Sequence, residues 1–141
     1  MFNNIFKILF LPHKIKNIKY DTIFIGFIIL FYFWFSPFFK YISLYAFILK
    51  SIVLIFFIFI NNVLRSFFYS INDFRIIFPY YMLSLSPILL LGFFSFFNYY
   101  LVIPLIWIEL LKGYKDFKNK NFYALVIGTF IDILIYIILW R

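Results

Sequence analysis

The strongest constraint on this chain is a series of long apolar runs that short polar or basic stretches separate. A helix needs about 20 mainly apolar residues to cross the hydrocarbon core of a membrane, and only helices and closed barrels span it. The runs do not alternate apolar with polar residues, so they favour helices. We therefore expect an all-α fold, a polytopic membrane helix bundle with about five transmembrane helices, at residues 22–39, 41–60, 75–91, 96–111 and 122–140.

Composition supports the same class of protein. Of the 141 residues, 67% are apolar and only 13% are charged, whereas a soluble domain is about half apolar and a quarter charged. The chain has no Cys, which excludes disulfides, iron–sulfur sites and thiol catalysis. The net charge of +8 lies between apolar runs rather than on one soluble face, so we predict no nucleic-acid partner.

The basic residues predict the topology, because Lys and Arg accumulate in cytoplasmic loops. With a cytoplasmic N-terminus, the inner side receives ten cations: Lys7, Lys14, Lys16, Lys19, Arg65, Arg75, Lys112, Lys115, Lys118 and Lys120. The outer side receives only Lys40 and Arg141. We expect an integral membrane protein with its C-terminus outside, in the cell membrane of a prokaryote with an AT-rich genome or in an organelle inner membrane.

The first 20 residues differ from the remainder, 21–141, which forms the predicted five-helix domain. Apolar residues at helical spacing precede Pro12 and a basic stretch, a pattern typical of an amphipathic helix lying in the cytoplasmic interface. Anionic lipid is the expected partner of this segment. Its predicted headgroup contacts are Lys7, Lys14, Lys16 and Lys19.

Two charges fall near the middle of predicted spans. Lys50 interrupts the second span and Asp132 the fifth, at similar depth and with opposite sign. Because a lone charge in hydrocarbon is costly, we predict an intramembrane ion pair between them that fixes helix packing. A proton or ion relay is the functional alternative, with Thr129 on the same helix face as Asp132.

The remaining polar residues indicate structural roles. Glu109 is expected to form an interfacial salt bridge with Lys112 or Arg75, and Asp73 to cap the third helix or stand in its first turn. The single histidine, His13, lies in the basic segment without partner ligands. The sequence has no catalytic or phosphate-binding motif, so we predict neither an enzyme nor a cofactor or metal.

Three short segments resemble the membrane domain of the YIP family, the Ypt/Rab-interacting proteins and their prokaryotic relatives. They are the proline-marked lead-in at residues 5–14, the sequence Asp73-Phe74-Arg75 with its downstream Tyr and Pro, and a Trp, Leu and Gly before the last polar loop. The positions that carry the resemblance are Pro12, Phe74, Arg75, Tyr81, Pro87, Trp107 and Gly113. The resemblance implies five helices with a cytoplasmic N-terminus. The long cytoplasmic domain of the eukaryotic, Rab-linked members is missing, so a small prokaryotic-type member is the better match.

These observations predict a YIP-type, non-enzymatic membrane scaffold or adaptor, acting by helix packing and contact with anionic lipid. Its partner would be a second copy or another membrane protein. An accessory subunit of a larger membrane complex, such as a respiratory one, is an alternative. Another is a small transporter or channel that uses Lys50 and Asp132.

Overall fold

The fold is a bundle of helices, seen here in a computed structural model that describes residues 2–15, 18, 21–34, 44–90 and 102–140. Every regular element in these ranges is helical, which confirms the predicted all-α class. The elements are α1 (Phe2–Phe10), η1 (Pro12–Lys14), α2 (Asp21–Trp34), α3 (Leu44–Phe67), α4 (Ile71–Leu83), η3 (Ser86–Leu90), α6 (Val102–Lys118) and α7 (Phe122–Trp140). Over the described residues, none of the helices combines the length and the apolar character that crossing a membrane requires.

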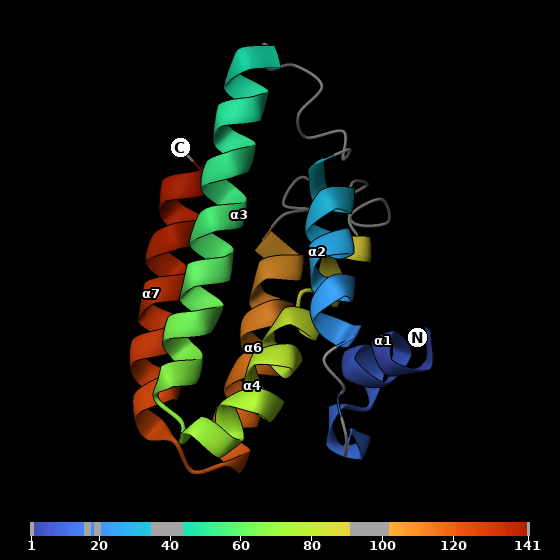
Figure 1. Cartoon of the computed structure of the whole chain (residues 1–141), viewed down its shortest axis with the longest axis vertical. Coiled ribbons are helices and arrows are strands. Elements are labelled where there is room, and N and C mark those ends of the chain that lie inside the picture. Colours follow the sequence, from blue (N-terminus) through green and yellow to red (C-terminus); the bar gives the residue numbers. More distant parts are fainter. Residues whose placement is uncertain (1, 16–17, 19–20, 35–43, 91–101, 141) are drawn as a thin grey trace.

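The helices pack as neighbours in a regular order. α3 lies along α7, α7 along α6, and α4 contacts both α3 and α2. Figure 1 shows the turns that follow α3 and α6 at the same end of the bundle, while α1 lies across that half of the molecule beside α2. This order places α3, α4, α6 and α7 around one shared interior.

Local sequence signals explain where α4 begins and ends. The hydroxyl of Ser70 accepts the backbone N–H of Asp73 at 3.3 Å and donates to the Asp73 carboxylate at 2.8 Å, a capping arrangement that satisfies a free N–H group. Asp73 is therefore a first-turn acid, as the sequence predicts. The helix ends at Leu83, and the chain continues as the 3-10 helix η3 with Pro87 in its first turn.

Two helices run further than the apolar pattern predicts. The second predicted span ends at residue 60, with continuation of its helix toward Arg65 allowed by the sequence, and α3 does continue to Phe67. The stretch 112–121, expected as a polar loop, is mostly the end of α6, which reaches Lys118. The charged residues of this stretch are spaced so that several share one helix face, and this is why the helix continues. The connection between the predicted spans 75–91 and 96–111 lies outside the described residues.

The apolar core surrounds α4 and η3. Tyr81, Met82 and Leu83 are fully buried there, and Ile25 and Ile29 of α2 cover them. α2 approaches closely because Gly26 has no side chain: a Cβ at this position would lie 2.9 Å from Cβ of Met82. On the other side of α4, toward α6 and α7, the interior is polar.

Candidate functional site

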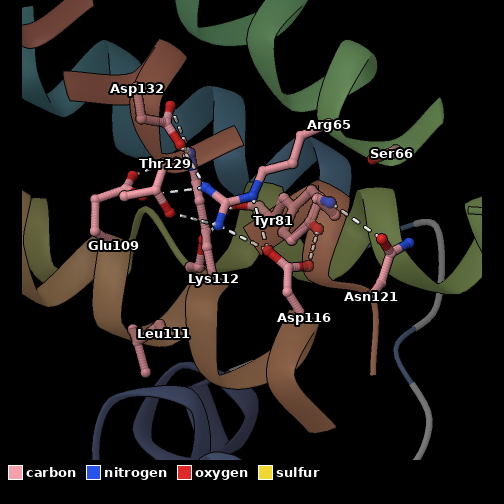
Figure 2. A network of polar contacts seen from close by, with 12 residues as sticks. Arg65, Ser66, Tyr81, Glu109, Leu111, Lys112, Asp116, Asn121, Thr129 and Asp132 are labelled. Atoms are coloured by element: carbon pink, nitrogen blue, oxygen red, sulfur yellow. Dashed lines mark hydrogen bonds and ion pairs between the residues drawn. The ribbon is translucent and has the colours of Figure 1, made fainter. Parts of the chain in front are cut away.

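Five charged side chains are buried together where α3, α6 and α7 meet. Figure 2 shows them around the guanidinium group of Arg65. The set, here called the charge network, consists of Arg65, Glu109, Lys112, Asp116 and Asp132. Buried charges are rare unless they are paired, so this cluster is the strongest candidate for a functional or architectural site.

Helical spacing brings these residues to one place. Glu109, Lys112 and Asp116 follow one another on α6 at intervals of three and four residues, which puts all three on one face. Asn61 and Arg65 are related in the same way on α3. Three helices thus each contribute a polar stripe, and the stripes face one another.

Arg65 is the centre of the network. Its Nη1 atom lies 2.6 Å from the Asp132 carboxylate and 3.1 Å from that of Glu109. Its Nη2 and Nε atoms lie 2.7 and 3.0 Å from one oxygen of Asp116. A planar guanidinium with donors in fixed directions is suited to join several carboxylates, so Arg65 connects α3 to both α6 and α7.

Asp132 accepts hydrogen bonds from two side chains besides Arg65, one on α6 and one on α3. The Lys112 ammonium lies 3.2 and 3.1 Å from its two oxygens, and the Asn61 side-chain amide donates to it as well. Asp132 is the only acidic residue of α7. Its carboxylate therefore fixes the rotation of α7 against α3 and α6.

Asp116 extends the network to α4. The hydroxyl of Tyr69, in the turn before α4, donates a hydrogen bond to a carboxylate oxygen of Asp116 at 2.5 Å. The hydroxyl of Tyr81 of α4 donates a hydrogen bond to the same oxygen. The guanidinium of Arg65 also lies over the Tyr81 ring, 5.4 Å from its centre. One carboxylate thus connects α3, α4 and α6.

Electrostatics favours charged Arg65 and neutral Tyr69. Burial would lower the pKa of Arg65, but the charges of Asp116, Glu109 and Asp132 outweigh burial and raise its pKa above the ordinary value. Burial, together with the hydrogen bond to Asp116, raises the pKa of Tyr69. Both groups therefore keep their protons throughout the physiological range.

A glycine makes room for Arg65. A Cβ on Gly128 of α7 would lie 2.7 Å from both Cδ and Nε of Arg65, closer than carbon atoms can pack. The Arg65 side chain thus passes directly over the backbone of α7. This contact explains how a long side chain from α3 reaches carboxylates on two other helices.

The network opens on one side to a groove of about 860 Å³ between α6 and α7. Glu109, Thr129 and Tyr136 contribute polar groups to a lining that is otherwise mainly apolar. The Tyr136 hydroxyl donates to Glu109 at 3.1 Å, and Arg65 lies 3.4 Å from the Thr129 hydroxyl. Glu109 is the member of the network that borders this groove.

The charges in the network do not balance. Two cations face three carboxylates, so the fully ionised set carries one excess negative charge. Within the described ranges, no group of three or more His, Cys, Asp or Glu residues is placed to hold a metal ion. The arrangement is suited to joining helices and to holding one additional proton or cation.

The structure gives Asp132 different partners from the predicted Lys50. Its ion pairs are with Arg65 and Lys112. The side chain of Lys50 lies outside the described part, but its backbone belongs to α3, eleven residues before Asn61. Thr129, the predicted companion of Asp132, contacts the same guanidinium.

The predicted salt bridge at Glu109 is present in part. Glu109 pairs with Lys112 at 3.8 Å, as the i, i+3 spacing predicts, and also with Arg65. Arg75 is exposed on α4 and forms no ion pair with any residue that the structure describes. The bridge differs from the expected surface contact because the Lys112 side chain is 1% exposed.

The predicted lipid-contacting lysines lie on the N-terminal segment. Lys7 is half-buried on α1 and Lys14 is exposed in η1, while Lys16 and Lys19 fall outside the described residues. α1 packs its Ile8 into the core and its Phe10 against Trp107 of α6, with ring centres 6.0 Å apart. The segment is thus bound to the bundle.

The positions that resemble the YIP family are spread over the molecule. Pro12 begins η1, Pro87 is buried in η3, and Phe74 stacks on Phe78 within α4, with ring centres 5.5 Å apart. Gly113 faces Leu125 of α7. Of these positions, Tyr81 contacts the charge network directly, through Asp116 and Arg65.

Sequence reasoning did not find Arg65, Asp116, Tyr69 or Asn61 as site residues. The sequence places Arg65 at the cytoplasmic end of the second helix and Asp116 in the last polar loop, because each lies beyond the end of an apolar run. The spacing of Glu109, Lys112 and Asp116 is the signal that would have shown a buried helix face.

Comparisons with protein-family models, with curated proteins and with solved structures find no match to this chain.

Proposed function

We propose that this chain is an integral membrane protein that acts as a non-enzymatic scaffold or adaptor, with the charge network holding its helices in one arrangement. The observation that carries the proposal is the distribution of side chains on α7. Its interior face presents Asp132 to Arg65 and Lys112. Its opposite face is apolar and exposed over the whole described length: Phe122, Tyr123, Val126, Ile127, Phe130, Ile133, Leu134 and Ile137.

This distribution is the reverse of that expected in water. A soluble monomer rarely exposes an apolar patch larger than a few hundred Å², and it keeps its charges outside. In a bilayer, by contrast, an apolar outer surface is in its preferred solvent, and ionisable residues face the bundle interior and pair with one another. The five predicted spans and the cytoplasmic N-terminus belong to this proposal, as does the location in a prokaryotic cell membrane or an organelle inner membrane.

The network supports a scaffold rather than a flexible assembly. Arg65 and Asp116 together join α3, α4, α6 and α7 by charge-assisted hydrogen bonds. Such bonds are short and directional, so they specify one rotation of each helix. The rigid outer face of α7 would then be presented to a second copy or to a membrane partner. The resemblance to the YIP family is part of this proposal and suggests a small prokaryotic-type member.

The test is extraction and topology in native membranes. We expect the chain to stay in the pellet after alkaline carbonate treatment. Single-cysteine variants at Lys118 and Arg141 should be labelled by an impermeant maleimide from the inner and the outer side, respectively. The unmodified chain has no Cys and serves as the blank. Release by carbonate would contradict membrane integration, and labelling of both sites from one side would contradict the topology.

A second candidate function is ion or proton movement through the network. The observation in its favour is a continuous set of ionisable groups, from Tyr69 through Asp116, Arg65 and Asp132 to Glu109, which borders the α6–α7 groove. The side-chain oxygen of Asn61 is also buried without a donor among the described residues. This function predicts flux in proteoliposomes that Asp132→Asn abolishes, whereas a scaffold gives none.

A further inference from the structure

A second hollow lies at the end of the bundle where the turns after α3 and α6 come together, an end that Figure 1 shows. Its volume is about 660 Å³. The side-chain amide of Asn121 joins the two turns by donating to the carbonyl of Phe68 at 2.8 Å. The charged residues in its lining are Asp73, Lys115 and Lys120. Here this site is called the basic hollow.

Lys115 is a cation without an anionic partner. It is half-buried on α6, and it forms no ion pair with any of the described residues. Its ammonium lies over the Tyr80 ring, 5.2 Å from the ring centre. Burial lowers the pKa of Lys115, Lys118 lowers it further, and Asp73 opposes both. A bound anion stabilises the charged form of a partly desolvated ammonium. Folding has already removed part of its water, so anion binding needs less further desolvation of this group.

Lys120 provides the second cation of the basic hollow. It occupies the turn between α6 and α7 with a φ of 56°, in the left-handed region where glycine or asparagine is usual. Asp73 is the single acidic residue of the lining, and its carboxylate already accepts the Ser70 hydroxyl at 2.8 Å. Two lysines and one aspartate give the lining a net charge of +1.

The exposed apolar side chains at the edge of the basic hollow, here called the rim, favour a lipid over a free anion as the ligand. Phe122 and Tyr123 are 60% and 74% exposed beside the hollow, and Ile76 is 47% exposed on α4. Aromatic side chains of this kind lie at the level of lipid headgroups, with apolar rings toward the acyl chains. A free phosphate would gain nothing from them.

We infer that the basic hollow binds the phosphate of an anionic lipid headgroup, with Lys115 and Lys120 contacting the phosphate and the exposed rim contacting the lipid body. The inference rests on the proposed membrane location. It adds a defined lipid site to the diffuse contact expected of the N-terminal lysines. The predicted topology places the hollow in the cytoplasmic leaflet, beside the basic end of α6 and the turn that follows it.

The experiment titrates short-chain phosphatidic acid into the full-length protein in mild detergent, with phosphatidylcholine of equal chain length as the neutral probe. Each lysine near a lipid phosphate strengthens binding about fivefold, so Lys115→Gln and Lys120→Gln should each weaken phosphatidic acid binding by about that factor. The matched control is Lys118→Gln, because Lys118 lies on the same helix but outside the hollow. It should change binding less than about twofold.

Two further variants make the test specific. Asp73→Asn removes the negative charge from the lining and should strengthen phosphatidic acid binding by a few fold. Tyr123→Ser removes a rim side chain and should weaken binding of the lipid but not of inorganic phosphate. Thermal unfolding without lipid verifies that each variant is folded, and if Lys115→Gln does not fold, Lys120→Gln on the exposed turn decides the result.

Three outcomes would overturn the inference. Equal weakening by Lys115→Gln, Lys120→Gln and Lys118→Gln would show general attraction without a site. Inorganic phosphate that competes with the lipid at equal concentration would assign the hollow to a free anion. A protein that resists carbonate extraction but binds phosphatidic acid equally in all variants would leave the membrane proposal standing and remove the lipid site.

Discussion

Replacing Gly128 with alanine should destabilise the protein through one identified contact. The new Cβ would lie 2.7 Å from Cδ and Nε of Arg65 and 2.8 Å from its Cγ. These atoms belong to the middle of the side chain rather than its tip. Three carboxylates hold the guanidinium end, so the side chain cannot move aside without losing at least one of its ion pairs.

The expected magnitude follows from opposing effects. Alanine in a helix interior is favoured over glycine by about 1 kcal/mol. Against this gain, overpacking of a close contact costs about 1–3 kcal/mol, and losing one hydrogen bond to a charged group costs about 1.5–3 kcal/mol. The net change is a loss of about 1.5–5 kcal/mol in the free energy of unfolding, or a fall in Tm on the order of 10 °C.

Gly113 provides a matched control in the interior of α6. A Cβ there would meet only the Cδ1 atom of Leu125, at 3.2 Å, and this is the movable end of a flexible side chain. Gly113→Ala should therefore be neutral or stabilising by up to about 1 kcal/mol. The assay is thermal unfolding of both variants and the parent chain in the same detergent. Loss of helix is monitored by far-ultraviolet circular dichroism.

The reasoning is refuted if Gly128→Ala is as stable as Gly113→Ala. That result would mean that Arg65 either does not cross α7 at this glycine or is free to leave its carboxylates. A decrease of similar size in both variants would point to a general need for glycine in these helices instead.

Three more predictions concern single members of the polar interior. Asp116→Asn should lower the free energy of unfolding by about 3–5 kcal/mol because it weakens the charge-assisted hydrogen bonds that Arg65, Tyr69 and Tyr81 donate to this side chain. The exposed Asp73→Asn should cost about 1 kcal/mol or less. Chemical denaturation compares the two variants. Lys112→Met leaves one cation facing three carboxylates in the network and should reduce Tm and purified yield. The control Lys118→Met, on the exposed side of the same helix, should change neither. Equal effects of the two substitutions would contradict the burial of Lys112. The pKa of the Tyr69 hydroxyl is raised above its ordinary value of 10.0. Above that pH the unfolded chain releases this proton while the folded chain keeps it. In a denaturation series, the stability advantage of the parent over Tyr69→Phe should therefore shrink as the pH rises above that value. A stability advantage of the parent over Tyr69→Phe that grows with pH would contradict the predicted direction of this pH dependence.

Helix positions were more predictable from the sequence than helix contacts. α7 (Phe122–Trp140) has the predicted bounds of 122–140, because an apolar run begins directly after Asn121, whose side-chain oxygen accepts the Ala124 N–H at 3.0 Å. α6 was predicted to end at 111, since hydropathy counts Lys112 and Asp116 as polar regardless of the direction in which they point. The direction of each side chain depends on its position around the helix axis, and a hydropathy average along the chain contains no information on that position.

The partners of Asp132 show a second limit of sequence reasoning. Depth and sign predict Lys50 as the partner, but the side chain of Lys50 lies outside the described residues, and within them Asp132 pairs with Arg65 and Lys112. Arg65 reaches Asp132 because α3 continues past its apolar run and because Gly128 admits a long side chain over α7, whereas Lys112 reaches Asp132 from α6. Both conditions depend on packing between segments more than 60 residues apart in the chain.

The position of Arg65 in the chain has a consequence for biosynthesis. Its partners Asp116 and Asp132 follow it by 51 and 67 residues. At about 5–20 residues per second, a ribosome needs on the order of 3–13 s to make that interval. During this time the nascent chain carries an arginine that has no carboxylate to receive it. A chain truncated before α6 lacks Glu109, Asp116 and Asp132, so its Arg65 has none of the three carboxylates that pair with it in the folded chain.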